Sequence, residues 1–227
     1  MIGLKKNLSV IKEFIAQYEK KYAREQNSVT LLAVSKGQSA LKIRALFEAG
    51  HPLFGENYLQ EALAKMQLLS DTDIEWHFIG RIQRNKTRKI AEHFSWVHSL
   101  SDLKIAERLH HQRPSHLPPL NLCVEVNVSA EKTKSGIPMD EASAFCKACL
   151  SFSNLRLRGL MTMPAPHKNI THQRAAFRKL FSLKKHIEQE GILLDTLSMG
   201  TSDDYEAAIA EGATFIRLGK TLFGPRN

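Results

Sequence analysis

Apolar residues follow two alternating kinds of spacing along this chain. Short apolar runs typical of buried β-strands are followed by longer segments in which apolar residues recur every three or four positions, as on one face of a helix. The first segment is helical, with Leu4, Leu8, Ile11 and Ile15 at that spacing. The strand-like runs after it are residues 29–35, 53–54, 76–79, 96–99, 120–127, 155–163, 194–199 and 214–218.

The segments between these runs have helical spacing. They cover residues 40–49, 56–69, 84–93, 102–111, 140–150, 171–189 and 203–211. Strands that alternate with helices form parallel sheets through right-handed crossovers, and eight such strands close a barrel. We therefore predict an α/β fold of the TIM (β/α)8 barrel type with an extra N-terminal helix, and an open doubly wound sheet is the alternative. No linker divides residues 1–227, so we expect a single domain.

Composition and charge narrow the class of protein. The chain is 43% hydrophobic and 24% charged, as in ordinary globular proteins, and its net charge is +9. That charge favours an anionic partner, which leaves a phosphorylated small molecule, nucleic acid or an anionic membrane surface. The N-terminal segment has no signal-peptide pattern and no run is long enough to span a membrane, so we expect a cytoplasmic protein.

The three cysteines are too few for a disulfide framework. Cys146 and Cys149 form a C-x-x-C motif, which in redox proteins begins at a helix N-terminus. Here the pair falls in the middle of the helical pattern that Pro138 opens, so helix packing is the favoured interpretation.

Candidate functional residues collect where the predicted strands end, which is where barrel enzymes place their sites. Lys36 directly follows the apolar run that begins the barrel. Partial removal from water there raises the fraction of neutral amine that can attack an aldehyde. A lysine that simply reaches into solvent is the alternative.

The last two strand ends have the composition of a phosphate site. Residues 197–204 combine hydroxyl side chains and Gly200 before a helix, and the alternative there is a helix cap made by Ser202 or Asp203. Gly219 permits close approach of a ligand. Arg217 in an apolar strand needs a partner, which can be a ligand or a structural ion pair.

Other polar groups are less specific. Asn57 and His77 can supply hydrogen bonds at the same end of the barrel, although a histidine between Trp76 and Phe78 is more often a core residue. Five histidines between 93 and 116 match no metal template, so we expect no metal site. The basic run 81–89 lacks interleaved aromatic residues, so a solvated helix face is favoured over nucleic-acid binding.

Several motifs occur together and in order. They are Ala33-Val34-Ser35-Lys36, Phe54-Gly55-Glu56-Asn57-Tyr58-Leu59-Gln60-Glu61, Trp76-His77-Phe78-Ile79-Gly80 with Gln83, Asn85 and Lys86, Lys134-Ser135-Gly136, Gly159-Leu160-Met161-Thr162-Met163-Pro164, Leu197-Ser198-Met199-Gly200, and Arg217-Leu218-Gly219 with Phe223-Gly224. This set, which covers nearly the whole chain, resembles the pyridoxal phosphate homeostasis protein family, whose fold is like the barrel domain of alanine racemases.

The resemblance implies specific roles in binding pyridoxal 5′-phosphate. By family similarity, Lys36 would form the cofactor aldimine and Arg217 would face the pyridine nitrogen. The phosphate would contact Ser198, Thr201 or Ser202, and Gly219, while Asn57 and His77 would line the pocket. Two positions depart from the family pattern: Thr201 stands where methionine is frequent, and Arg81 where a neutral residue is common. These departures leave the number of hydroxyl groups on the phosphate open.

The expected activity is binding rather than catalysis. An arginine at the pyridine nitrogen disfavours the protonated ring that makes pyridoxal phosphate an electron sink. The chain ends soon after the last strand, so we expect no second domain to supply a racemase's second base, and a monomer is favoured. We therefore expect a protein that buffers or delivers pyridoxal phosphate to apoenzymes and influences vitamin B6 and amino-acid pools. A weak amino-acid racemase is the alternative.

Overall fold

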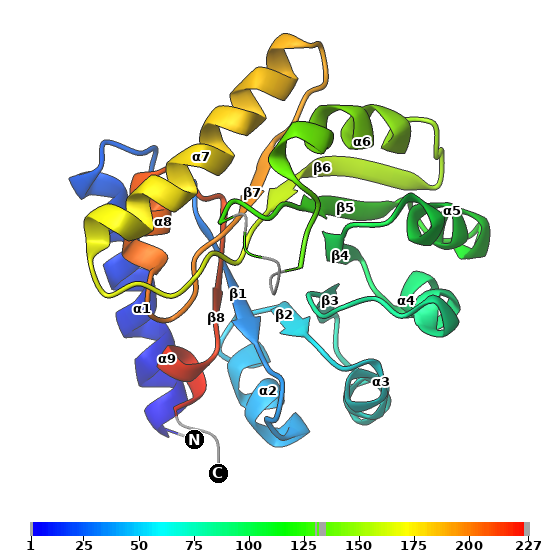
Figure 1. Cartoon of the computed structure of the whole chain (residues 1–227). Coiled ribbons are helices and arrows are strands. Elements are labelled where there is room, and N and C mark those ends of the chain that lie inside the picture. The colour runs from blue at the N-terminus through cyan, green and yellow to red at the C-terminus, as the bar shows by residue number, and fades with distance from the viewer. Residues whose placement is uncertain (1, 130, 132–134, 225–227) are drawn as a thin grey trace.

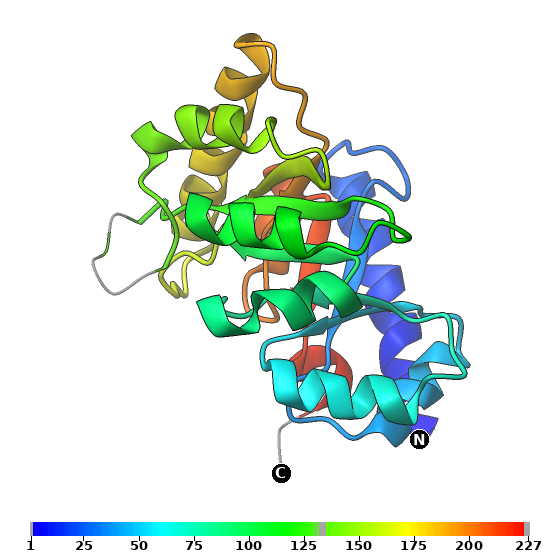
Figure 2. The same cartoon turned by 90° about the vertical axis from the view of Figure 1, so that its right-hand side faces the viewer.

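The computed structural model describes residues 2–129, 131 and 135–224. Within these ranges eight parallel strands form a closed barrel in chain order (Figure 1). The first and last strands close it through the pairs Thr30 with Phe215 to Ala33 with Leu218. Helices surround the barrel on the outside (Figures 1 and 2). The predicted (β/α)8 barrel is therefore confirmed, and the open sheet is excluded.

The elements follow the predicted order. The strands are β1 (Thr30–Val34), β2 (Leu53–Glu56), β3 (Glu75–Phe78), β4 (Trp96–Leu100), β5 (Leu120–Glu125), β6 (Leu155–Met161), β7 (Thr196–Ser198) and β8 (Phe215–Leu218). The helices are α1 (Ile2–Lys21), α2 (Ala40–Phe47), α3 (Leu59–Leu68), α4 (Thr87–His93), α5 (Leu103–Gln112), α6 (Ala142–Cys149), α7 (Ile170–Gln189), α8 (Tyr205–Ala210) and α9 (Lys220–Phe223). Short 3-10 helices η1 (Arg84–Lys86) and η2 (Met139–Glu141) precede α4 and α6.

The extra N-terminal helix is present as α1. Its residues Leu4, Leu8, Ile11 and Ile15 are buried, as their spacing predicted. The helix contacts α2, α8 and α9, and the side-chain amide of Asn7 donates a hydrogen bond of 3.0 Å to the carbonyl oxygen of Leu222. The apolar stripe of α1 thus joins the beginning of the fold to its last helix.

Several element boundaries differ from the sequence prediction by a few residues, and one short helix was not predicted. The second strand continues through Glu56, whereas the pattern placed Glu56 at the start of a helix. Glu56 pairs in register with Phe78 and is fully buried, and the cation of Lys65 compensates its buried charge. The pattern also omitted α9, which is only four residues long and therefore lacks a detectable apolar period.

The interior of the barrel is separate from the main core between strands and helices. Leu32, Val34 and Ile79 form one apolar cluster there, and Trp96 and Cys123 belong to another. Alternate residues of a strand point to opposite faces, which is why neighbours in the same strands pack outward against the helices. Among the described residues, no helix has the length and apolar character needed to cross a membrane.

Candidate functional site

A cavity of about 490 Å³ opens at the carboxyl ends of the strands. That volume is within the usual range for a small-molecule site. Six of the predicted site residues line it, from the ends of four strands and the loops that follow them. They are Lys36, Asn57, Thr201, Ser202, Arg217 and Gly219.

Lys36 lies two residues after Val34, the last residue of β1, and its two neighbours in the chain are held by a largely buried cluster of charged side chains. The ammonium group of Lys65 donates to the carbonyl oxygen of Ser35 at 2.7 Å. The amide of Gly37 donates to Glu61 Oε1 at 2.6 Å. These contacts fix the backbone on both sides of Lys36, so its side chain leaves the strand at a defined point.

The same ammonium group joins two carboxylates. Lys65 Nζ lies 2.7 Å from Glu56 Oε1 and 2.5 Å from Glu61 Oε1, and the Ser35 hydroxyl also donates to Glu56 at 2.6 Å. Burial raises the pKa of Glu56, and the hydrogen bond from Lys65 opposes that rise. Sequence reasoning missed Lys65, although its i,i+4 spacing from Glu61 was a readable signal.

Arg217 lines the cavity from inside the barrel, with only 4% of its surface exposed. It donates from Nη1 to the hydroxyl of Ser198 at 2.7 Å and from Nη2 to the carbonyl oxygen of Thr162 at 3.0 Å. Burial lowers the pKa of Arg217 to about 10, which leaves the guanidinium protonated at neutral pH. These two hydrogen bonds fix the guanidinium at the wall of the cavity.

Asn57 supplies the clearest sign that the cavity suits a polar ligand. Its Oδ1 atom is buried and, within the described part of the chain, has no hydrogen-bond partner. A buried acceptor without a partner is costly, and a ligand that donates to it would remove that cost. Asn57 also lines a larger neighbouring cavity of about 1010 Å³, so it stands between the two.

The loops after β7 and β8 meet beside the cavity. The hydroxyl of Ser202 accepts a hydrogen bond of 3.2 Å from the amide of Thr221 at the start of α9. Thr201 donates from its amide and its hydroxyl to Asp204 Oδ1, at 2.6 and 2.9 Å. Thr201 is therefore occupied in shaping the loop, whereas Ser202 and Gly219 lie where the two loops join.

Two predicted residues do not line the cavity. His77 is completely buried inside the barrel, and its ring nitrogens contact Glu75 and His98. Ser198 is also completely buried and contacts His98 and Arg217. Both side chains point into the barrel because they occupy inward positions of β3 and β7, and a contact between either residue and a ligand stays a prediction.

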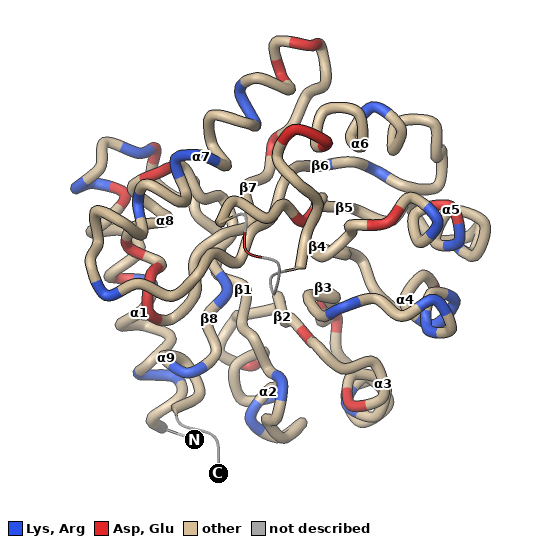
Figure 3. Tube along the Cα trace, viewed as in Figure 1, with Lys and Arg blue, Asp and Glu red and all other residues tan. Residues whose placement is uncertain are grey.

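The remaining sequence motifs have structural settings. Cys146 and Cys149 are buried in α6, and burial raises the pKa of each thiol to about 12, which disfavours the redox interpretation. No group of metal-binding side chains occurs among the described residues. Basic residues lie along several outer helices, including α4, α5 and α7 (Figure 3). Lys134 of the Lys134-Ser135-Gly136 motif lies outside the described residues.

The amino-acid sequence is similar to those of known proteins over its full length. Residues 7–227 match the family described as alanine racemase, N-terminal domain. A curated relative from Pseudomonas aeruginosa, named pyridoxal phosphate homeostasis protein, is 50% identical over the full chain and 97% of its own length. The chain belongs to the pyridoxal phosphate homeostasis protein family. Another member, from Escherichia coli K12, is 43% identical over 97% of this chain and 96% of its own.

Solved structures of similar proteins have the same fold as this chain. PipY of Synechococcus elongatus, described with pyridoxal phosphate bound, is 32% identical and has a TM-score of 0.85, covering 97% of this chain and all of its own. The structure of the same protein without pyridoxal phosphate is 34% identical in sequence and has a TM-score of 0.86, with the same coverage of both chains. An alanine racemase from Clostridium difficile, at 14% identity and a TM-score of 0.75, shares the barrel fold over 57% of its length.

Proposed function

We propose that this protein binds pyridoxal 5′-phosphate in the 490 Å³ cavity, with Lys36 as the covalent attachment point. The observation that carries the proposal is that one cavity brings together Lys36, Arg217 and the joined loops after β7 and β8. The membership of the chain in a family named for pyridoxal phosphate homeostasis, and the ligand described for PipY, support the same assignment.

The attachment chemistry needs only the groups that line the cavity. Lys36 would hold the ligand covalently: its neutral amine would form one carbon–nitrogen bond with the aldehyde carbon, and the aldehyde oxygen would leave as water. The reverse step needs one water molecule and returns both partners unchanged. No oxidant or reductant is required, so the protein can hold and release the aldehyde reversibly.

The other lining residues match the remaining parts of the ligand. Ser202, Gly219 and the loops that contain them would hold the phosphate. The loops after the seventh and eighth strands of such barrels often bind phosphate groups. Arg217 would face the ring nitrogen, and because a guanidinium only donates hydrogen bonds, that nitrogen would keep its lone pair. Pyridoxal phosphate supplies an electron sink best when this nitrogen is protonated, so Arg217 favours storage over catalysis.

The biological role that follows is buffering or delivery. A reversible Schiff base would keep the reactive aldehyde bound and pass it to an acceptor amine, such as the lysine of an apoenzyme that depends on pyridoxal phosphate. Such a protein would take part in vitamin B6 homeostasis and influence amino-acid pools in the cytoplasm. A weak amino-acid racemase remains the second candidate, because the barrel is shared with alanine racemases.

The first experiment locates the covalent bond. Protein is mixed with pyridoxal phosphate, reduced with borohydride and mapped by mass spectrometry. Lys36→Ala is compared with Lys220→Ala, since Lys220 lines the same cavity and controls for nonspecific modification. We expect the adduct on Lys36 in the wild type and in Lys220→Ala, and its loss in Lys36→Ala. An adduct on Lys220, or none, would contradict the proposal.

A second experiment separates delivery from catalysis. Loaded protein is incubated with an apoenzyme whose activity reports transfer, and in parallel with amino acids in deuterium oxide. Delivery predicts reactivation of the apoenzyme without measurable exchange of the amino-acid α-proton. Exchange that disappears in Lys36→Ala would support the racemase instead.

A further inference from the structure

A continuous line of hydrogen bonds crosses the inside of the barrel beneath the cavity. It begins at Glu75, in the first position of β3, whose Oε1 lies 2.9 Å from His77 Nε2. His77 Nδ1 lies 2.8 Å from His98 Nε2, and His98 Nδ1 lies 2.7 Å from the hydroxyl of Ser198. Ser198 in turn accepts from Arg217 Nη1 at 2.7 Å. Residues from four strands thus form one chain.

The inner members of this chain are shielded from water. His77, His98 and Ser198 have no exposed surface, whereas 42% of the Glu75 side chain is exposed. The ring of His77 stacks on Trp96 with 5.5 Å between centroids and 4° between planes, and Phe215 contacts both histidines. A buried chain of this kind has strong hydrogen bonds and a high cost for any unpaired member.

Both histidines are neutral, which limits where protons can lie. Burial lowers the pKa of His77 and lowers that of His98 well below its ordinary value of 6.5. The hydrogen bond from His77 lowers the pKa of Glu75, so that group is a carboxylate at neutral pH. Each neutral imidazole has one donor nitrogen and one acceptor nitrogen.

Only one arrangement of protons then satisfies every member. A carboxylate only accepts, so His77 carries its proton on Nε2 and accepts on Nδ1. His98 must therefore donate from Nε2, which leaves its Nδ1 to accept the hydroxyl proton of Ser198. The lone pairs of Ser198 are then directed at Arg217. All the hydrogen bonds therefore run in a fixed order of donors and acceptors. Arg217, which only donates, ends the chain at the cavity, and Glu75, which only accepts, ends it on the other side.

We infer that Glu75, at the opposite end of the barrel from the cavity, is a positioning residue for Arg217, acting through the three side chains between them. The carboxylate fixes the tautomers of His77 and His98, and these fix the hydroxyl of Ser198. The guanidinium is then held by Ser198 on one side and by the carbonyl of Thr162 on the other. Its remaining donors face the ligand without reorganising when the ligand binds.

The first test needs no ligand, so it does not depend on the proposed function. Nitrogen-15 NMR of the histidine rings reports which nitrogen carries the proton. We expect the Nε2–H form for both His77 and His98 in the wild type. Glu75→Leu removes the acceptor and should give mixed tautomers, while Glu75→Gln retains an acceptor oxygen and should restore the wild-type pattern. A charged ring or an Nδ1–H form in the wild type would overturn the inference.

The second test concerns the ligand, and this part rests on the proposed function. Glu75→Leu should weaken pyridoxal phosphate binding about tenfold, which corresponds to roughly 1.4 kcal/mol. A carbocyclic analogue, with C–H in place of the ring nitrogen, has no acceptor for Arg217. The variant and the wild type should therefore bind this analogue equally, and an equal loss for both ligands would contradict a role through Arg217.

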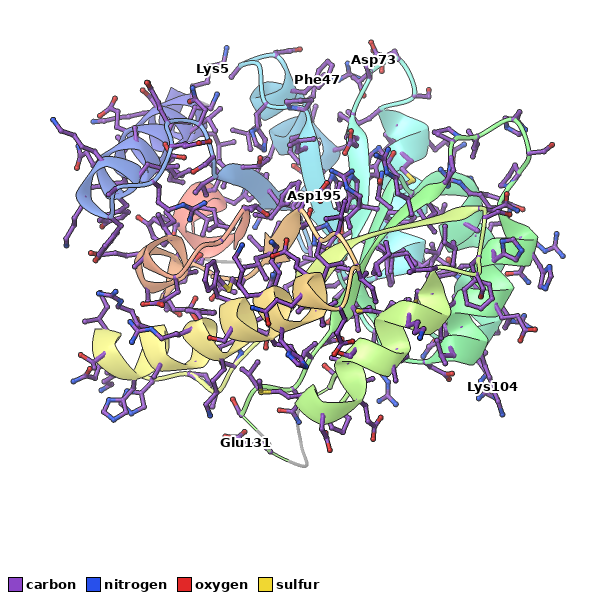
Figure 4. All side chains as sticks on the ribbon, turned by 90° about the horizontal axis from the view of Figure 1, so that it is seen from above. Lys5, Phe47, Asp73, Lys104, Glu131 and Asp195 are labelled. Carbon is purple, nitrogen blue, oxygen red and sulfur yellow. The ribbon has the colours of Figure 1, made fainter. Side chains whose placement is uncertain are left out.

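The matched control is Asp73→Asn. Asp73 is an exposed carboxylate two residues before Glu75, at the outer edge of the molecule (Figure 4). The Asp73→Asn variant removes one negative charge from the same segment without changing the chain of hydrogen bonds. The histidine tautomers and the affinity for pyridoxal phosphate should therefore not change. A tenfold loss in this variant would show that net charge, rather than the chain, matters. Failure of the wild type to bind pyridoxal phosphate would remove the proposed function while the NMR result still decides the chain.

Discussion

Lys65 and Ser35 are joined by a 2.7 Å hydrogen bond from the ammonium group to the backbone carbonyl oxygen immediately before Lys36. A lysine that is itself buried thus holds the strand end that presents another lysine to the cavity. The arrangement separates two roles of the same residue type: Lys65 is ion-paired and structural, while Lys36 lines the cavity.

Replacing Lys65 should destabilise the fold strongly. Lys65→Met would leave the fully buried carboxylate of Glu56 without its cation, and loss of one partner of a buried ion pair costs about 3 kcal/mol or more. The free energy of unfolding in urea measures this. The control is Lys89→Met, because Lys89 is more than half exposed and forms a surface ion pair with Glu92. Equal stability of both variants would contradict a structural role for Lys65.

Gly200 should tolerate alanine poorly. Its φ angle is +93°, and an added Cβ would lie 2.5 Å from the Cβ of Ala208. We expect Gly200→Ala to lower the free energy of unfolding by more than 2 kcal/mol, through backbone strain and overlap together. Gly191→Ala isolates the first effect, since its φ is +88° but nothing lies near its added Cβ. That variant should lose only about 1 kcal/mol.

Ser202 and Thr201 should differ in their effect on pyridoxal phosphate affinity. The hydroxyl of Thr201 already donates to Asp204, whereas Ser202 lies where the two loops meet. Ser202→Ala should weaken binding about tenfold, as expected for a lost hydrogen bond to a charged phosphate. Thr201→Val should weaken it less. Spectroscopic titration of both variants gives the comparison, and the reverse order would reassign the phosphate contact.

Stability should fall as the pH drops below neutral. Burial lowers the pKa of His51 from 6.5 to about 4, and lowers those of His77 and His98. Below pH 6.5 the unfolded chain therefore binds protons that the folded chain does not, and each such histidine costs up to about 1.4 kcal/mol per pH unit. The loss from His51 would be complete near pH 4.

A variant isolates this contribution from that of the carboxylates. His51→Gln keeps a donor for the carbonyl oxygen of Leu53 but cannot titrate. Urea unfolding between pH 7.5 and 4.5 should show a shallower decline in this variant than in the wild type. The exposed His116 is the control, and His116→Gln should follow the wild type. Parallel curves for His51→Gln and the wild type would contradict the assignment.

The cysteines should be unreactive in the folded protein. Cys123, Cys146 and Cys149 are buried, and burial raises the pKa of each thiol. A thiol reagent should therefore label none of them under native conditions and all three in denaturant. Rapid native labelling of the C-x-x-C pair would revive the redox interpretation.

The barrel was predictable from sequence because its signal is repeated. Each apolar run was confirmed as a strand, and the inward and outward alternation follows from strand geometry. The predicted residues at strand ends also converged, since parallel strands bring their carboxyl ends together. Lys36 and Arg217 line one cavity, as this rule predicts, and their roles toward a ligand stay predictions.

Depth inside the barrel was not predictable in the same way. His77 and Ser198 carry the residue types of a ligand site, but they lie one layer below it. Glu75 lies two residues from His77 in the same strand, but His98 is 100 residues from Ser198, and no local pattern indicates that closure of the barrel brings these two together. Lys65 was missed for a similar reason, because burial of its charge depends on Glu56 in a neighbouring element.

The packing of α1 against α8 and α9 has a consequence for synthesis on the ribosome. The helix that emerges first finds part of its partner surface only after Leu222 has been made, as the hydrogen bond from Asn7 illustrates. Until then the apolar stripe from Leu4 to Ile15 is incompletely covered, and exposed stripes of this kind attract chaperones and promote aggregation. Because β1 pairs with β8, closure of the barrel also waits until Leu218 has been synthesised.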